Sequence, residues 1–424
     1  MDAVAEQKKP QNQLRIWQHV AVFSLACAVI ISRRPDAVFH AQFWAEDGRV
    51  WYADAYNCGW WATLSRAYYG YLEIFPRLGA SLALLAPLAF APVVLNCIAI
   101  AVQALPVNLL LSVRSSVWGS LRYRVLLAGM YLSLPNCWEI DATITNTQWL
   151  LALIAVLLVV ATKPRSTRGR LLDLCTISLC GLNGPFCIFL FPIALFLAWK
   201  HRDRWRWIDV SVLAACSSVQ VWNLLNGGLS SRPHLRLGAS PVMFARILAG
   251  QVYLGTLLGG ITQPPHVGLG YLIALIGIAA GGTTLVTACF LRSPLPMKLF
   301  LLFSTMLLAA SLIAPALGSL VGLTAWEGMV IGAGARYWFF PTLAFAWAIL
   351  WCFQSRSRAL KIVSALLLCI LGFGVALRWR HPAFRDMHFV EYARKFEAAP
   401  PGTAITIPEN PEGWNLRLIK RRSN

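Results

Sequence analysis

The chain consists of long apolar runs joined by short basic or aromatic loops, and this pattern restricts it to one broad class of fold. The runs are roughly 16 to 25 residues long, enough for an α-helix to cross the hydrocarbon core of a bilayer. Only 13% of the 424 residues are charged and 58% are hydrophobic, whereas soluble domains carry about a quarter charged residues. The sequence therefore predicts an all-α polytopic membrane protein with about 10–12 transmembrane helices.

The basic residues predict how the chain is oriented in the membrane. The formal net charge is +19, but Lys and Arg fall in small clusters between the apolar runs, as positive-inside anchoring expects. The expected partner of these residues is the lipid bilayer and not nucleic acid. Lys8, Lys9 and Arg15 place the start of the first run, residues 17–32, in the cytoplasm.

The distribution of polar residues predicts the domain organisation. Residues 1–377 are expected to form the transmembrane domain, and residues 378–424 a short extracytoplasmic tail with too little apolar content for an independent domain. Residues 33–76 are too polar to span and form the first extracytoplasmic loop. Residues 48–64 within it are aromatic-rich and amphipathic, which favours an interfacial helix. Its tryptophans are expected at headgroup depth: Trp51, Trp60 and Trp61.

Two apolar stretches do not fit a single straight crossing. Residues 78–113 are too long for one crossing and barely long enough for two, and two crossings conflict with a cytoplasmic position for the basic loop at Arg114. Residues 171–199 contain Gly181, Gly184 and Pro185. They are predicted to form two half-helices, an arrangement tolerated where helices line a cavity.

The sequence FWAEDG at residues 43–48 places two adjacent carboxylates, Glu46 and Asp47, in the first outer loop. Ionisable groups held at a membrane surface are costly and tend to be functional. A carboxylate partly withdrawn from water has a raised pKa, which suits a general base near neutral pH. Adjacent helical residues point about 100° apart, so both cannot reach one substrate atom. In one interpretation one carboxylate acts as the general base, with Asp47 preferred over Glu46, and the other caps the following helix. In the other interpretation both carboxylates are helix caps.

Other polar and aromatic residues of the outer loops are candidates for holding substrate. Aromatic rings beside carboxylates hold sugars by stacking and hydrogen bonding, but they also form the aromatic belt of membrane proteins. Amide and acid side chains at the mouth of a helix either orient a substrate or cap the helix. The candidate substrate-binding residues are Trp44, Tyr69, Tyr71, Glu139, Asn146 and Tyr337.

Arginines on the outer side are candidates for binding phosphate. Arg336 precedes a predicted helix, where a fixed cation and free backbone N–H groups favour an anion. The alternative is an interfacial anchor whose cation reaches toward water. Arg77 and Arg232 are further candidates on the same side.

Several of these motifs together resemble the GT-C superfamily of integral membrane glycosyltransferases. The resemblance rests on the acidic pair of the first loop, on NTQW at residues 146–149, on GLNGPF at residues 181–186, and on Arg336-Tyr337 followed by Pro341. It implies that Asp47 or Glu46 is the catalytic base. It also implies transfer of a sugar from a polyprenyl-phosphate donor to a glycan, lipid or protein acceptor, at the periplasmic face of a bacterial inner membrane.

The chain departs from the superfamily in two respects. It has no WWDYG-type motif, and the large soluble C-terminal domain is reduced to residues 378–424. Metal use varies in the superfamily, so a divalent cation, Mg²⁺ or Mn²⁺, stays open as a cofactor, although no metal-binding motif is present. The alternative functions are a lipid-linked-sugar flippase or secondary transporter, and a non-catalytic subunit in envelope biogenesis. A transporter is expected to carry ionisable residues in the middle of its helices, whereas here the acids cluster at outer ends.

Overall fold

The computed structural model describes residues 14–228, 235–264, 267–318 and 322–421, and these are largely helical. Seven described helical segments are long and apolar enough to cross a membrane, and two shorter apolar helices accompany them. This confirms an all-α polytopic membrane protein, while the predicted number of 10–12 crossings stays a prediction. The seven segments are Ile16–Arg33, Leu88–Leu111, Arg204–Asn226, Pro241–Leu258, Leu269–Arg292, Leu295–Ile313 and Arg358–Leu377.

The described residues up to Ile247 form twelve α-helices, with four short π or 3-10 helices between some of them. The α-helices are α1 Ile16–Arg33, α2 Asp36–Phe39, α3 Ala53–Cys58, α4 Trp60–Thr63, α5 Ile74–Ala83, α6 Ala91–Leu111, α7 Leu121–Ser133, α8 Thr147–Val160, α9 Thr167–Gly181, α10 Phe186–His201, α11 Arg204–Asn223 and α12 Pro241–Ile247. The turns are η1 Asp47–Tyr52, η2 Leu88–Phe90, η3 Val113–Trp118 and η4 Leu224–Gly228.

The second half adds further helices and one hairpin. The helical elements are η5 Leu248–Tyr253, α13 Leu254–Leu258, α14 Leu269–Arg292, α15 Leu295–Ile313, α16 Ala325–Val330, η6 Ala335–Trp338, α17 Phe339–Phe353, α18 Arg358–Leu377 and α19 Phe389–Ala398. The strands β1 Ala404–Glu409 and β2 Trp414–Ile419 are antiparallel, with Ala404 opposite Ile419 and Glu409 opposite Trp414.

Residues 78–113 contain one short helix and one segment long enough to cross a membrane. α5 has 10 residues and is therefore about 15 Å long, half the thickness of the hydrocarbon core. Only the following segment, Leu88–Leu111, is long enough to cross. One crossing is compatible with Arg114 on the cytoplasmic side, so the conflict seen in the sequence disappears.

The basic loops meet at one end of the helix bundle. Arg114 donates to the carbonyl of Thr162 at 2.9 Å and pairs with Asp173. Lys163 pairs with Asp209, which lies in the first turns of α11. These contacts join three loops that the positive-inside pattern assigns to the cytoplasm. We call this the basic end, and the opposite end, which carries the C-terminal tail, the tail end.

The predicted pair of half-helices is confirmed. α9 ends at Gly181 and α10 begins at Phe186, directly after Pro185. Gly184 has φ 85°, a left-handed conformation that favours glycine. Asn183 bridges to Glu73 of the first outer loop. The break between the half-helices therefore lies against that loop.

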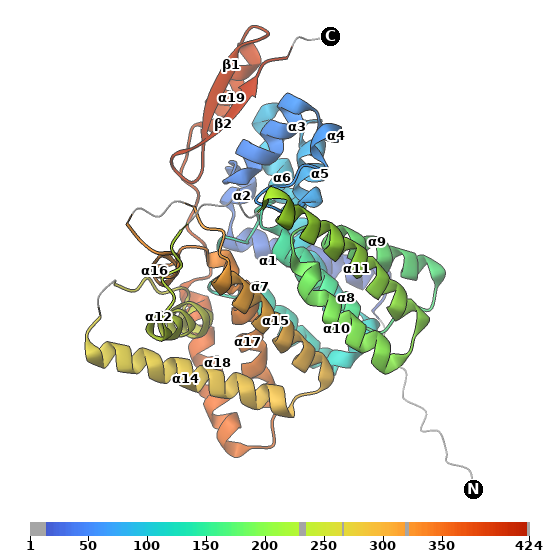
Figure 1. Cartoon of the computed structure of the whole chain (residues 1–424), viewed down its shortest axis with the longest axis vertical. Helices are drawn as coiled ribbons and strands as arrows, with labels where there is room; N and C mark the ends of the chain where they lie inside the picture. Colours follow the sequence, from blue (N-terminus) through green and yellow to red (C-terminus); the bar gives the residue numbers. More distant parts are fainter. Residues whose placement is uncertain (1–13, 229–234, 265–266, 319–321, 422–424) are drawn as a thin grey trace.

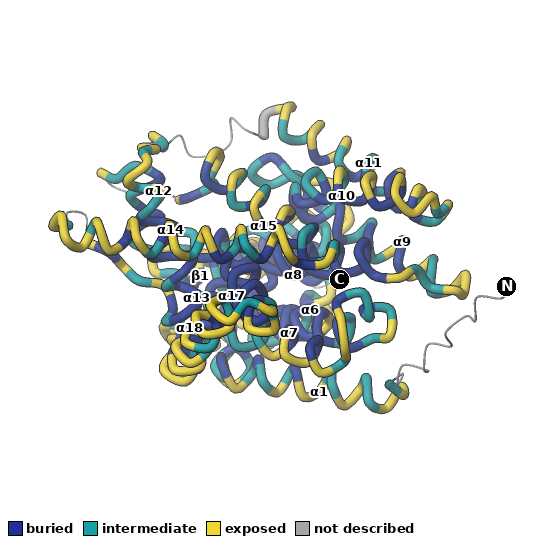
Figure 2. The backbone as a smooth tube through the Cα atoms, turned by 90° about the horizontal axis from the view of Figure 1, so that it is seen from below, coloured by how far each residue is buried: buried dark blue, intermediate teal, exposed yellow. Residues whose placement is uncertain are grey.

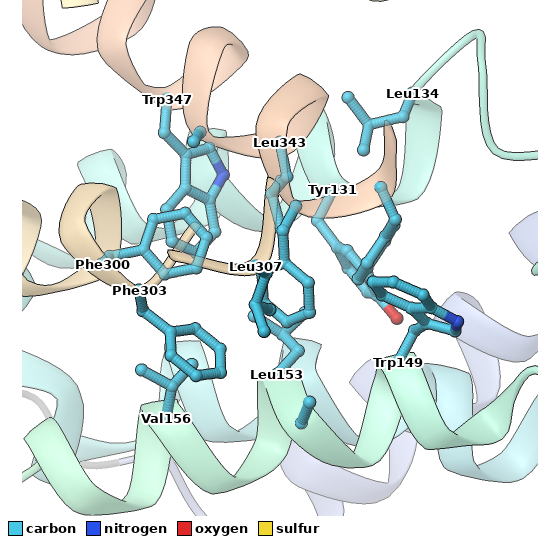
Figure 3. Close-up of a cluster of buried hydrophobic side chains, with 14 of the residues drawn as sticks. Tyr131, Leu134, Trp149, Leu153, Val156, Phe300, Phe303, Leu307, Leu343 and Trp347 are labelled. Atoms are coloured by element: carbon cyan, nitrogen blue, oxygen red, sulfur yellow. The ribbon is translucent and has the colours of Figure 1, made fainter. Parts of the chain in front are cut away.

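The core of the bundle is built around α8. Every residue of α8 is buried, and Figure 2 shows it surrounded by helices whose outer faces are exposed. Aromatic and aliphatic side chains of α8, α15 and α17 pack against one another, as Figure 3 shows for Leu153, Phe303 and Trp347. The flanking helices α1 and α18 are each only 17% buried over their most apolar windows. Their exposed apolar surface is what a bilayer would cover.

The C-terminal tail packs closely against the first outer loop. It forms α19 and the β1–β2 hairpin, which lie beside α3 at the tail end (Figure 1). Its inward-facing side chains complete a second hydrophobic cluster with the first outer loop. The tail contributes Phe389, Phe396, Ile407, Leu416 and Leu418.

The predicted interfacial helix of residues 48–64 is divided into η1, α3 and α4, with a break at Gly59 (φ 90°). Trp60 and Trp61 are exposed, in keeping with an interfacial position. The expectation for Trp51 is wrong. Its ring is buried and its Nε1 donates to Thr145 Oγ1 at 2.9 Å, so it anchors the loop to the bundle.

Candidate functional site

A polar cavity of about 180 Å³ lies at the tail end, between the first outer loop, the segment before α8 and the segment before η6. We call it the polar pocket. It brings together most of the side chains singled out in the sequence, although they are spread over nearly three hundred residues. These are Trp44, Glu46, Tyr69, Tyr71, Glu139, Asn146 and Arg336.

Glu46 is the member of the acidic pair that lines the polar pocket. It occupies the N-cap position of η1 but its side chain makes no capping hydrogen bond. Burial raises the pKa of its carboxyl group, and the nearby positive charge of Arg336 partly offsets this rise. The carboxylate is therefore available to a molecule in the pocket.

Asp47 points away from the polar pocket into the protein. Its Oδ1 accepts hydrogen bonds from Thr145 N at 3.0 Å and from Thr145 Oγ1 at 2.5 Å. Burial raises its pKa to about 7, while the bonds from Thr145 act in the opposite direction. Asp47 occupies the first turn of η1, where a capping acid was expected, but its carboxylate ties the first loop to the segment before α8.

Glu409 is a buried residue of this region that sequence reasoning missed. It lies on β1 above Gly48, where a Cβ atom would stand 2.1 Å from Glu409 Oε2. Burial, and next the negative charge of Asp47, raise its pKa to about 9. Neither carboxyl oxygen accepts a hydrogen bond from a side chain of the described residues. The only sequence signal was its place on the inward-facing register of β1, shared with Ile407.

Arg336 and Glu139 form an ion pair across the polar pocket. The backbone N–H of Arg336 donates to Glu139 Oε2 at 2.9 Å, and its guanidinium pairs with the same carboxylate. The other guanidinium nitrogen donates to the carbonyl of Ala316 at 2.7 Å. The Arg336 side chain stays 26% exposed. Arg336, a predicted phosphate-binding residue, and Glu139, a predicted substrate-binding residue, thus form one unit.

Arg77, the other predicted phosphate-binding arginine that the structure describes, does not join this unit. Arg77 is buried outside the polar pocket, where it pairs with Asp54 at 3.0 Å and lies 4.9 Å from the ring of Trp51. Its charge is therefore used to hold the first loop. Arg232 lies outside the described residues.

An apolar cavity of about 230 Å³ adjoins the polar pocket. Tyr337, another predicted substrate-binding residue, lines this apolar pocket. Its hydroxyl group donates to the carbonyl of Ala316 at 2.9 Å. Apolar walls come from α8, α10 and α15: Trp149, Phe186, Phe189 and Leu307. Among the described residues, the two cavities share Tyr71, Gln148, Ala316 and Arg336.

The backbone around the polar pocket is strained. Ala45 and Tyr69 line the pocket with φ values of 51° and 47°, and Ala142 in the loop before α8 has φ 59°. Left-handed conformations of residues other than glycine cost free energy and tend to persist where they position functional groups. The strain next to Glu46 is therefore an independent indication that this pocket is functional.

Metal-binding geometry occurs elsewhere in the described part of the chain. Cys137, Asp141 and His381 place one ligand atom each within 4.8 Å of one another, the only such group found there. Arg33 Nη1 lies 3.3 Å from Asp141 Oδ2, so a guanidinium already neutralises this carboxylate. The cluster is better explained as an ion-paired support for the tail than as a metal site.

A scan against protein-family models and a search of the curated proteins found no match to this chain.

Proposed function

We propose that the protein is a glycosyltransferase of the inner membrane that transfers a sugar from a polyprenyl-phosphate donor to an acceptor hydroxyl group at the extracytoplasmic face. The observation that carries this proposal is the junction of the polar and apolar pockets at Arg336. A lipid-linked sugar has the matching order of groups: an apolar chain, a phosphate and a polar ring.

In this mechanism the donor lies across the junction. The polyprenyl chain occupies the apolar pocket beside Phe186 and Leu307, and the sugar lies in the polar pocket. The phosphate comes to Arg336, whose partly exposed guanidinium is the shared cation of both cavities. A cation there stabilises the negative charge that grows on the leaving phosphate.

Glu46 acts as the general base. Its carboxylate takes the proton of the acceptor hydroxyl group, the acceptor oxygen forms a bond to the anomeric carbon, and the bond from that carbon to the phosphate oxygen breaks. Polyprenyl phosphate leaves with the bonding electrons. A base whose pKa is raised by burial is well matched to proton abstraction near neutral pH. Asp47, bonded to Thr145, is a positioning residue in this scheme.

The proposal is tested with the full chain purified in phosphatidylcholine nanodiscs. Radiolabelled polyprenyl-phosphate sugars are added with envelope glycan extracts, and both transferred and hydrolysed sugar are measured. We expect turnover by the wild type and at least a hundredfold loss in Glu46→Gln, typical of removing a general base. Glu397→Gln, an exposed acid of α19, is the matched control. Equal turnover by Glu46→Gln and wild type would exclude the mechanism.

A further inference from the structure

A third cavity at the tail end, of about 720 Å³, is larger than the polar pocket and shares Trp44 and Pro411 with it. Its walls come from the residue after α1, the loop before α8, the turn after α13 and residues 377–385, where the tail leaves α18. The proposed transfer reaction assigns it no role. We call it the cationic pocket because of its side chains.

Positive charge dominates the lining of the cationic pocket. Arg378 and Arg380 are exposed in it and form no ion pair with any residue of the described ranges. Arg385 also lines it and pairs with Glu412 at the exposed rim. Glu412 is the only carboxylate among the described residues that line the pocket, so the pocket keeps an excess of unpaired cations.

Arg34 supplies a buried cation with unused hydrogen-bond donors. Its side chain is 1% exposed, and its Nη1 donates to the carbonyl of Asp141 at 3.0 Å. Its Nε and Nη2 have no hydrogen-bond partner in the described structure. Leaving buried donors of a charged group unsatisfied is costly. The guanidinium fork matches the paired oxygens of a phosphate or carboxylate, so the missing partner is best supplied by an anion.

Aromatic rings stand beside these cations. The Arg34 guanidinium lies 4.5 Å from the ring of Phe384, which stacks on Trp44 with the ring centroids 4.7 Å apart. Trp138 meets Trp44 edge to face at 5.8 Å. Flat apolar faces next to cations suit a saccharide ring that carries an acidic group. Trp44 also lines the polar pocket, so such a saccharide reaches toward Glu46.

We propose that the cationic pocket binds an anionic group, a phosphate ester or a carboxylate, on the acceptor substrate, so that the acceptor is an acidic saccharide or a phosphate-bearing glycolipid. Arg34, Arg378 and Arg380 hold the anion, and the acceptor passes over Trp44 with its hydroxyl group at Glu46. The assignment of this ligand as acceptor rests on the proposed transferase function, whereas the anion site itself does not.

Binding is measured first, without any transfer reaction. The full chain in phosphatidylcholine nanodiscs is titrated with radiolabelled glucose 6-phosphate, glucuronate and neutral glucose, at low and high salt. We expect one of the two anions to bind at least tenfold more tightly than glucose, and its affinity to fall with salt because Arg378 and Arg380 are exposed. A parallel titration in nanodiscs containing phosphatidylglycerol distinguishes a lipid headgroup from a soluble acceptor, since a bound headgroup competes with the added anion.

The arginine variants decide the assignment. The double variant Arg378→Gln/Arg380→Gln, at exposed positions, is expected to lower anion affinity at least tenfold. Arg34→Lys is also expected to lower it, because lysine lacks the paired donors of the guanidinium group. Arg356→Gln/Arg358→Gln removes the same charge from exposed positions flanking the start of α18 and is expected to bind normally. Anion binding that is absent, equal to that of glucose or unchanged in Arg378→Gln/Arg380→Gln would overturn the anion site.

Transfer is assayed separately, so the two proposals fail in different ways. If the wild type binds the anion through these arginines but shows no transfer, the proposed transferase function and the acceptor role are both refuted. The proposal of an anion site would still hold. Transfer that depends on Glu46 but is unaffected in kcat and acceptor KM by Arg378→Gln/Arg380→Gln would remove the acceptor role alone.

Discussion

The guanidinium of Arg336 is held by the carboxylate of Glu139, a residue 197 positions earlier in the chain. This pair links the segment before α17 to the loop before α8 and forms one wall of the polar pocket. The cation expected to meet the donor phosphate is therefore already positioned, and a phosphate has to share it with Glu139.

Substitutions of this pair are expected to have opposite effects on donor binding. Arg336→Gln removes the cation at the junction of the pockets and is expected to weaken donor binding more than tenfold. Glu139→Gln keeps a hydrogen-bond acceptor for Arg336 but removes the competing charge, so the donor is expected to bind at least as tightly as to the wild type. Equilibrium binding of labelled polyprenyl-phosphate sugar measures both, and weakened binding in both variants would contradict the sharing of Arg336.

The acidic pair is expected to divide its work between chemistry and positioning. Glu46→Gln should lower turnover about 10²- to 10⁴-fold with donor binding retained. Asp47→Asn should cost less, because an asparagine Oδ1 can still accept both bonds from Thr145. The acid limb of the wild-type pH–rate profile should lie above the ordinary range of a glutamate, since burial raises the pKa of Glu46. A larger loss in Asp47→Asn than in Glu46→Gln would reverse the roles.

Glu409 is expected to make stability fall as pH rises. Its pKa is raised to about 9 in the folded state, so between the unfolded value and 9 the folded state binds the extra proton. Stability is therefore full at low pH and falls by up to about 1.4 kcal/mol per pH unit as pH increases. Glu409→Gln cannot titrate at this position, so its free energy of unfolding should rise relative to that of the wild type between pH 7 and 9. This range lies above the pKa of about 7 of the neighbouring Asp47.

The measurement is thermal unfolding in nanodiscs at pH 7, 8 and 9, with Glu397→Gln as the exposed control. If the difference in melting temperature between Glu409→Gln and the wild type is the same at all three pH values, the carboxyl group of Glu409 titrates normally.

Asp141 is expected to hold the tail to the bundle. It lies 2.5 Å from His381 Nε2 and 3.3 Å from Arg33 Nη1, and all three side chains are buried. Although burial opposes ionisation, Arg33 and then His381 hold its pKa well below the usual range. Asp141→Asn leaves a buried cation without its counter-charge, which typically costs about 3–5 kcal/mol. Chemical unfolding and proteolysis of the tail measure the loss.

Asp386→Asn is the matched control for Asp141, because Asp386 belongs to the same tail but is exposed. It is expected to change the unfolding free energy much less. Similar effects of the two substitutions would show that the buried ion pairs do not hold the tail.

The sequence by itself determined the class of fold and much of the list of site residues. Apolar runs long enough to cross a bilayer leave an all-α multi-pass protein as the only arrangement that satisfies the backbone in lipid. The glycines and proline of residues 181–185 fixed the break between α9 and α10 because their backbone preferences are local. Placement of costly acids and arginines in outer loops singled out Glu46, Glu139 and Arg336.

Only the tertiary structure decided which of these residues meet. Glu46 lines the pocket and Asp47 turns inward because Thr145, about a hundred positions later, supplies the hydrogen bonds that hold Asp47. Glu409 reaches Gly48 from the far end of the chain because the hairpin completes its core on the first loop. Such contacts depend on packing between distant segments, and no local pattern encodes them. The acidic pair could be found in the sequence, whereas the orientation of its two carboxylates is a property of the folded protein.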